Sequence, residues 1–227
     1  MCFSATVSLT AAATLIPVGA YCLTASRNSG AGWMAFAAYP LVFGMQQLME
    51  GIVWHGIEDG NLSVIEMASR SFAFFSHFFW LFWVPFSVWL LETDPTRKRF
   101  LLFLTAFGFC YGLSIFIPLL QEGWLSVEVA RNSLDYRATM IYDGVIDRTV
   151  IRIVYALQVV TAFMVSTNPK VRLFGILILL SVIAAFIFYK YAFVSVWCFF
   201  AALLSFYIAY MVRDVRAFNS AKFIPES

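Results

Sequence analysis

The sequence predicts an all-α membrane protein, a polytopic transmembrane bundle of about seven helices that forms one domain over 1–227. Of its 227 residues, 62% are hydrophobic and 12% are charged, whereas a soluble domain is about 45–50% apolar and about 25% charged. Each membrane-spanning helix needs about 20 mostly apolar residues, so this length holds about seven spans. The expected partner is therefore the lipid bilayer. A nucleic-acid partner is excluded because the net charge is only +2 and the basic residues are scattered.

Seven apolar segments carry this prediction, and turn-forming runs such as Asn168-Pro169 separate them. Backbone groups in hydrocarbon must be satisfied within the segment, so each segment is predicted to be a helix. The alternating pattern of a membrane barrel is not visible. The segments are 5–25, 32–55, 64–91, 99–120, 149–167, 171–189 and 191–212.

The distribution of Lys and Arg predicts the orientation, because cytoplasmic loops are enriched in these residues. With the N-terminus outside, nine of them fall in the inner loops and the C-terminal tail: Arg27, Arg97, Lys98, Arg99, Lys170, Arg172, Arg213, Arg216 and Lys222. Three fall in the outer loops (Arg131, Arg137 and Lys190), and three more stand at outer helix ends (Arg70, Arg148 and Arg152). We therefore expect the N-terminus outside and the C-terminus in the cytoplasm.

The longest connection, 121–148, lies outside in this topology and is rich in charged residues. Its stretch from Leu134 to Ile146 partly alternates polar and apolar side chains, and Asp143-Gly144 is a hairpin-turn dipeptide. A small structured cap over the outer mouth of the bundle fits this pattern. A solvated loop without a role fits it equally well.

Polar side chains gather on one face of the second apolar segment. Gln46, Glu50 and Trp54 stand at i, i+4 and i+8, with Gln47 one step aside. A carboxylate costs several kcal/mol in the middle of a bilayer and faces the bundle interior. Glu50 is therefore the first candidate for a functional site. The alternative is that Glu50 pairs with an arginine only to hold helices together.

The neighbouring segments offer partners for this face. Arg70 and His77 lie on one stripe of the third segment, and an antiparallel arrangement brings Arg70 to the depth of Glu50. We expect a Glu50 to Arg70 ion pair, with Arg152 at the start of the fifth segment as a second candidate partner. On the last segment, Cys198 belongs to a stripe of small residues whose simplest role is close helix packing.

A metal site is a further hypothesis, because four metal-ligating side chains could approach one outer pocket in this topology. Thiolate, carboxylate and imidazole are ligands for zinc, and copper or iron would also fit softer ligands. The four residues come from four separate segments and show no local metal-binding spacing. They are Cys2, Glu50, His77 and Cys198.

Three separated motifs resemble a known family. They are Met1-Cys2-Phe3-Ser4-Ala5, the stretch from Gln46 to Trp54, and the stretch from Ser195 to Ala202. Together they are similar to a family of uncharacterised bacterial membrane proteins that begin Met-Cys-Phe-Ser, along most of the chain. The resemblance implies a multi-pass protein of the bacterial inner membrane and brings no activity. The residues that it highlights are Cys2, Gln46, Gln47, Glu50, Trp54, Trp197 and Cys198.

Three functions remain open at this point. The first is a small transporter or sensor that binds a small molecule or ion in a polar pocket of the outer leaflet. The second is a membrane enzyme that uses a metal such as zinc, held by Cys2, Glu50, His77 and Cys198. The third is a structural subunit of a membrane assembly. The candidate ligand-binding residues are Gln46, Gln47, Glu50, Trp54, Arg70, His77, Arg152 and Trp197.

Overall fold

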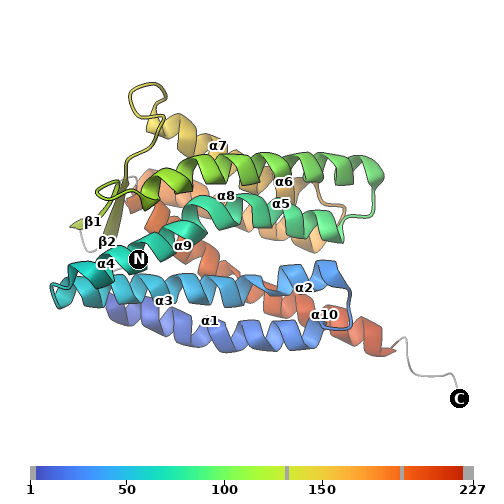
Figure 1. Cartoon of the computed structure of the whole chain (residues 1–227). Coiled ribbons are helices and arrows are strands. Elements are labelled where there is room, and N and C mark those ends of the chain that lie inside the picture. The colour runs from blue at the N-terminus through green and yellow to red at the C-terminus, as the bar shows by residue number, and fades with distance from the viewer. Residues whose placement is uncertain (1–3, 131–132, 190–191, 222–227) are drawn as a thin grey trace, which may run out of the picture.

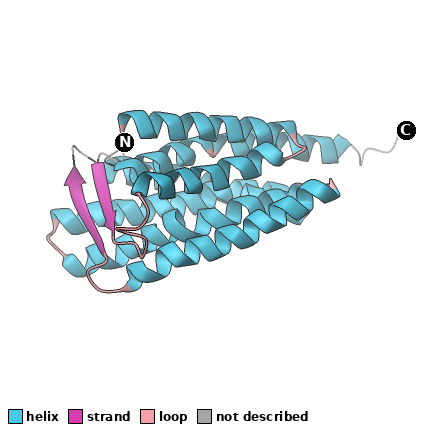
Figure 2. Ribbon diagram, turned by 90° about the horizontal axis from the view of Figure 1, so that it is seen from above, coloured by secondary structure: helices cyan, strands magenta, loops and turns pink. Residues whose placement is uncertain are grey.

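A computed structural model describes residues 4–130, 133–189 and 192–221, and each of the seven predicted segments forms helix within these residues. The helices lie side by side along one direction, with a β-hairpin at one end (Figures 1 and 2). We call this end the hairpin end. The α-helices are α1 (Ala5–Ser26), α2 (Ala31–Ala37), α3 (Tyr39–Glu58), α4 (Leu62–Ala73), α5 (Trp80–Leu91), α6 (Pro95–Phe116), α7 (Arg148–Val165), α8 (Pro169–Phe188), α9 (Phe193–Leu204) and α10 (Phe206–Ala221). A π-helix, η1 (Phe74–Phe79), joins α4 to α5, and a 3₁₀ turn, η2 (Ile117–Leu120), follows α6.

Six helical stretches of the described residues are long and apolar enough to cross a membrane, so the chain is a multi-pass membrane protein. The stretch that contains α3 is more polar, because it carries Gln46, Gln47 and Glu50. It still lies along the spanning helix α1, where small residues allow close approach: a Cβ at Gly51 would meet the Leu9 side chain at 2.5 Å. The six stretches are Ala5–Ser26, Leu62–Leu91, Pro95–Leu120, Arg148–Val165, Pro169–Phe188 and Phe193–Asp214.

The hairpin consists of β1 (Leu125–Ala130) and β2 (Ser133–Ala138), paired antiparallel with Val127 opposite Tyr136. One face of β2 is buried against the helices, and the Tyr136 ring stacks on Phe72 of α4 at a centroid distance of 4.4 Å. The position of the turn expected from the sequence was wrong. Asp143-Gly144 lies in a later turn, and the strands reverse between Ala130 and Ser133, where 131–132 lie outside the described residues.

A polar contact joins three helices in the middle of the bundle. Pro85 has no N–H, so it leaves the carbonyl of Leu81 without its helical donor. Gln158 of α7 supplies that donor: its Nε2 lies 3.3 Å from Leu81 O and 2.6 Å from Leu104 O of α6. The helices approach closely here, because a Cβ added at Gly108 would lie 2.0 Å from Leu81 O.

We predict that G108V destabilises the protein by about 1–3 kcal/mol or more, because the new side chain must push α5 and α6 apart. The measurement is the temperature at which the detergent-solubilised protein loses its monodisperse peak in size-exclusion chromatography. A106V is the matched control, since Ala106 lies on the exposed face of the same helix. Equal midpoints for the two variants would contradict the close approach.

At the end opposite the hairpin, Glu92 joins two loops. Its carboxylate accepts hydrogen bonds from the backbone N–H groups of Thr93, Asp94 and Thr167 at 2.8, 2.9 and 2.8 Å, and from the Thr167 hydroxyl at 2.9 Å. Burial acts to raise the pKa of the Glu92 carboxyl, but these hydrogen bonds outweigh it and hold the pKa below its ordinary value. Glu92 therefore ties the α5–α6 loop to the α7–α8 loop. We call this the Glu92 clamp.

We predict that E92Q lowers stability by about 1–3 kcal/mol at neutral pH, because the hydrogen bonds lose their charged acceptor. A carboxyl whose folded pKa is depressed stabilises the fold above its unfolded pKa, and this contribution disappears as the pH falls through the folded pKa. The difference between wild type and E92Q should therefore shrink below the ordinary value of 4.5. Unfolding midpoints across this range measure it, with E66Q on the exposed face of α4 as control. A difference independent of pH would contradict the assignment.

Candidate functional site

A cavity lies beneath the hairpin, between β2, η1, α7 and α9. Its volume is about 60 Å³, counted as the space that the centres of water molecules can occupy. One water needs about 10–15 Å³ on this measure, so the space is large enough for several. We call it the hairpin cavity. It is lined by Ser76, His77, Ile115, Tyr136, Ala138, Met140, Arg148, Ile151, Arg152, Tyr155, Phe193, Val194, Trp197 and Cys198.

His77 reaches this cavity from the π-helix η1. π-helical turns are rare, and they occur frequently at functional sites. The His77 Nδ1 lies 2.9 Å from the Ser76 hydroxyl, which donates to the Phe72 carbonyl at 3.1 Å. When Ser76 uses its proton in this way, the protonated Nδ1 of His77 donates to the Ser76 oxygen. The turn thus holds the imidazole in a fixed orientation.

Arginines surround the entrance to the hairpin cavity. A wider cleft of about 330 Å³, on the same measure of volume, shares Tyr136, Ala138, Arg148 and Arg152 with it. We call it the arginine cleft, because Arg137 also lines it, together with Asp135. Guanidinium groups bind carboxylates and phosphates through paired hydrogen bonds. The cleft therefore has the chemistry to receive an anion.

Ion pairs fix two of these arginines. Arg148 donates to both oxygens of Asp143 at 3.0 and 2.9 Å, and this hydrogen bonding holds the pKa of the Asp143 carboxyl below its ordinary value. Arg137 contacts Glu128 at 2.7 Å and Asp135 at 3.3 Å. Arg152 lies deeper, with its guanidinium carbon 5.7 Å from the centre of the Phe193 ring.

A second polar group lies inside the bundle, where α3 meets α5 and α9. Gln46, Gln47 and Glu50 are completely buried. Ser195 Oγ donates to Glu50 Oε1 at 2.6 Å, and Gln47 Nε2 donates to Glu50 Oε2 at 3.2 Å. The indole N–H of Trp80 donates to Gln46 Oε1 at 2.7 Å. We call these five side chains the buried polar cluster, and they join three helices by hydrogen bonds.

Several buried polar atoms have no hydrogen-bond partner among the described residues. They include Gln46 Nε2, Gln47 Oε1, and the indole N–H groups of Trp54 and Trp197. A buried donor without a partner costs about 1–3 kcal/mol. Trp197 is 6% exposed and lines the hairpin cavity, so its indole ring lies beside any molecule that enters the cavity.

The structure places the predicted site residues in four locations. His77, Arg152 and Trp197 line the hairpin cavity, whereas Gln46, Gln47 and Glu50 belong to the buried polar cluster. Trp54 packs in the apolar cluster that contains Phe72 and Cys198. Arg70 is on the surface.

The expected ion pair between Glu50 and Arg70 was wrong. Arg70 Nη2 lies 2.6 Å from Glu66 Oε1, one helical turn away on α4. Arg70 keeps most of its hydration when it pairs with Glu66, because both side chains remain substantially exposed. The inward orientation of Glu50 was predicted, and its carboxyl group accepts hydrogen bonds from Gln47 of α3 and Ser195 of α9.

The expected metal site is not supported. No group of three or more His, Cys, Asp and Glu side chains in the described part of the chain could hold a metal ion. Cys198 does lie beside Gln46 and Glu50, whereas His77 belongs to the opposite wall of the hairpin cavity. Cys2 lies outside the described residues.

The chain matches a family of unknown function, DUF6629, over residues 1–222. The chain belongs to this family. The resemblance to an uncharacterised family is thus confirmed, and the bacterial origin of the chain stays a prediction. No curated protein and no solved structure matches it. Membership in DUF6629 brings no activity.

Sequence analysis missed several residues that shape these sites. Ser195 was named only as the start of a family motif, although its hydroxyl donates to Glu50 Oε1 at 2.6 Å. Trp80 and Tyr155 were hidden among many aromatic residues. The one available signal for Tyr155 was its spacing, because it follows Arg152 by three residues and shares its helix face.

We predict that E50Q and S195A are energetically coupled, because Ser195 donates to the Glu50 carboxylate. The coupling energy of the double-mutant cycle should be about 1–3 kcal/mol, as for a hydrogen bond to a charged group. Unfolding midpoints of the four proteins measure it. The matched control is E50Q with S205A, since Ser205 is buried on the same segment but donates to Ala202 O. Equal coupling in both cycles would show that the contact is not specific.

Proposed function

We propose that this membrane protein binds a small molecule in the hairpin cavity, for transport or sensing. The observation that supports this best is the unpartnered indole N–H of Trp197 in the wall of a cavity that also presents His77. Ligand sites are mostly apolar, with a few polar groups that orient the ligand. The hairpin cavity has this composition.

The proposed orientation makes the cavity accessible from outside the cell. Nine Lys and Arg residues lie on the inner side of the predicted topology and six on the outer side, including the outer helix ends. The hairpin end is then external, and the membrane is the bacterial inner membrane. The arginine cleft becomes the entrance from the outside, and the hairpin becomes a cap over it.

In this proposal the buried polar cluster has a positioning role. Ser195, Trp197 and Cys198 lie on one turn of α9, and Glu50 holds that turn through Ser195. The hydrogen bond therefore fixes the side of α9 that lines the hairpin cavity. Glu50 is then a positioning residue that acts through α9.

The native thiol of Cys198 tests access to the cavity. In a chain whose other cysteines are serine (C2S, C22S and C110S), we predict that the small anionic reagent 2-sulfonatoethyl methanethiosulfonate modifies Cys198. I151W should slow this reaction at least tenfold, because Ile151 lines the cavity. The readout is the mass shift of the intact protein after labelling.

I153W is the matched control, since Ile153 is exposed on the same helix. Its labelling rate should equal that of the background chain. Both tryptophan variants must elute as monodisperse protein, and V194W provides a second obstruction of the same cavity. An unreactive Cys198, or an equal rate in all variants, would refute access through the hairpin cavity.

A further inference from the structure

We propose that the ligand of the hairpin cavity is an anionic amphiphile, with its acidic head group at Arg148 and Arg152 and its alkyl chain extending into the bundle. This inference rests on the proposed function and names the chemical class of its ligand. The carboxylate or phosphate head could belong to a free fatty acid or to a membrane lipid.

The three cavities share walls in sequence. The arginine cleft and the hairpin cavity share Arg148 and Arg152, as described above. The hairpin cavity in turn shares Tyr155, Trp197 and Cys198 with a third cavity deeper in the bundle. A molecule that passes the arginines therefore meets Trp197 next, and then the third cavity. We call this third space the apolar cavity.

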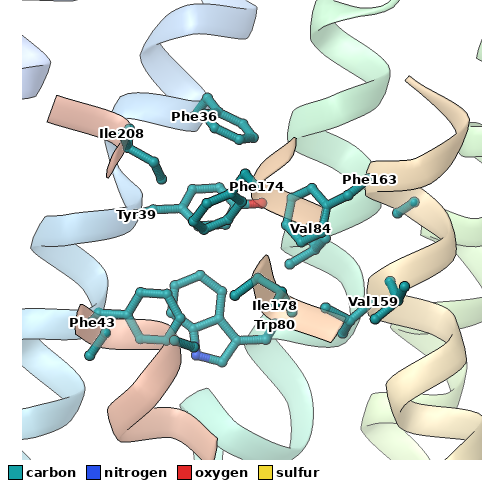
Figure 3. Close-up of a cluster of buried hydrophobic side chains, with 14 of the residues drawn as sticks. Phe36, Tyr39, Phe43, Trp80, Val84, Val159, Phe163, Phe174, Ile178 and Ile208 are labelled. Atoms are coloured by element: carbon teal, nitrogen blue, oxygen red, sulfur yellow. The ribbon is translucent and has the colours of Figure 1, made fainter. Parts of the chain in front are cut away.

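Polarity falls along this path. The arginine cleft presents charged side chains, whereas the apolar cavity is lined mainly by aromatic and aliphatic side chains. Phe43 and Trp80 stack there at a centroid distance of 3.9 Å, and Val159 and Ile178 lie near them (Figure 3). The Tyr39 hydroxyl is already bonded to Ser87 at 2.8 Å, and the other tyrosine of the lining, Tyr155, lies on the side shared with the hairpin cavity. This wall offers contacts for hydrocarbon.

The apolar cavity has room for about two or three groups the size of a water molecule, so it fits the end of a slender alkyl chain. It measures about 30 Å³ on the same scale as the hairpin cavity. A space lined by apolar side chains does not hold water well, because water finds no hydrogen-bond partners there. An alkyl chain gains from entering it, and each methylene transferred from water raises affinity roughly fourfold. A head group cannot follow without losing its hydration.

The junction between the polar and apolar parts is where a head group would stop. Arg152 is half-buried, and it lines both the arginine cleft and the hairpin cavity. The unpartnered N–H of Trp197 lies in the wall shared by the hairpin cavity and the apolar cavity. Guanidinium and indole N–H groups are donors only, so both favour the oxygens of an acid over a cationic or apolar head.

The experiment measures binding of radiolabelled dodecanoate to the full chain in phosphatidylcholine nanodiscs, with empty nanodiscs subtracted and the free concentration determined. We expect saturable binding of one dodecanoate per chain. Decanoate should bind roughly fifteenfold more weakly, because it lacks two methylenes. Dodecyltrimethylammonium should fail to compete. Absence of saturable binding, equal affinity for both acids, or competition by the cation would overturn the proposal.

Two variants distinguish the residues that bind the acidic head group from those that contact the alkyl chain. R152Q should weaken dodecanoate binding at least tenfold and leave the ratio between dodecanoate and decanoate unchanged. A201F narrows the apolar cavity and should reduce that ratio toward one. A106F, on the lipid-facing side of α6, is the control for an added ring. If R152Q binds like wild type, the head group is not at the arginines, and the proposal fails.

Two further binding measurements distinguish the source of the head group. Replacing part of the phosphatidylcholine with phosphatidylglycerol should weaken dodecanoate binding if membrane lipid occupies the site, and leave it unchanged if free acids do. Inorganic phosphate alone should not compete, because it has no chain; full competition by phosphate would refute an amphiphilic ligand.

Labelling of Cys198 separates this inference from the proposed function. Dodecanoate should protect Cys198 from the methanethiosulfonate reagent. If Cys198 reacts but dodecanoate neither binds nor protects it, the cavity admits small molecules and only the amphiphile is refuted. If Cys198 does not react in the absence of dodecanoate, both proposals fall.

Discussion

Polar side chains inside a bilayer must find their partners within the protein, and this constraint accounts for how α3 meets α5 and α9. Lipid offers no hydrogen bonds, so Gln46 and Glu50 turn inward and bind Trp80 and Ser195. The same constraint acts on the backbone at Pro85, where Gln158 replaces the missing donor. These contacts join five of the helices through hydrogen bonds.

The sequence predicted the helical segments because their signal is strong: long apolar runs must be helical in lipid. It also predicted that Gln46, Gln47 and Glu50 face inward, since their spacing and their cost in lipid are visible in one segment. Their partners could not be predicted, because packing between distant segments decides them. Arg70 had a closer and cheaper partner in Glu66, and the Ser195 hydroxyl gave no signal that distinguishes it from a packing residue.

Of the residues that line the hairpin cavity, the sequence predicted His77, Arg152 and Trp197, but the position of the cavity beneath the hairpin could not be predicted, for two reasons. It depends on the π-helix η1, which turns His77 toward α7 and α9. A π-helical turn contains one residue more than an α-helical turn, and the apolar pattern of the sequence does not reveal this extra residue. It also depends on β2, and the prediction of a hairpin turn at Asp143-Gly144 put that strand in the wrong place. Asp143 instead holds Arg148 at the entrance, so this residue serves the cleft and not the strand reversal.

The Glu92 clamp has a mechanical consequence for the whole bundle. It fastens the α5–α6 pair to the α7–α8 pair at the end opposite the hairpin, through the two hydrogen bonds that Thr167 donates to the Glu92 carboxylate. Because Gln158 also joins α7 to α5 and α6 in the middle of the bundle, the two helix pairs can separate only at the hairpin end. The hairpin joins α6 to α7 at that free end and spans the gap that such separation would widen. Separation of the two helix pairs is thereby confined to the end of the bundle where the hairpin cavity and the arginine cleft lie.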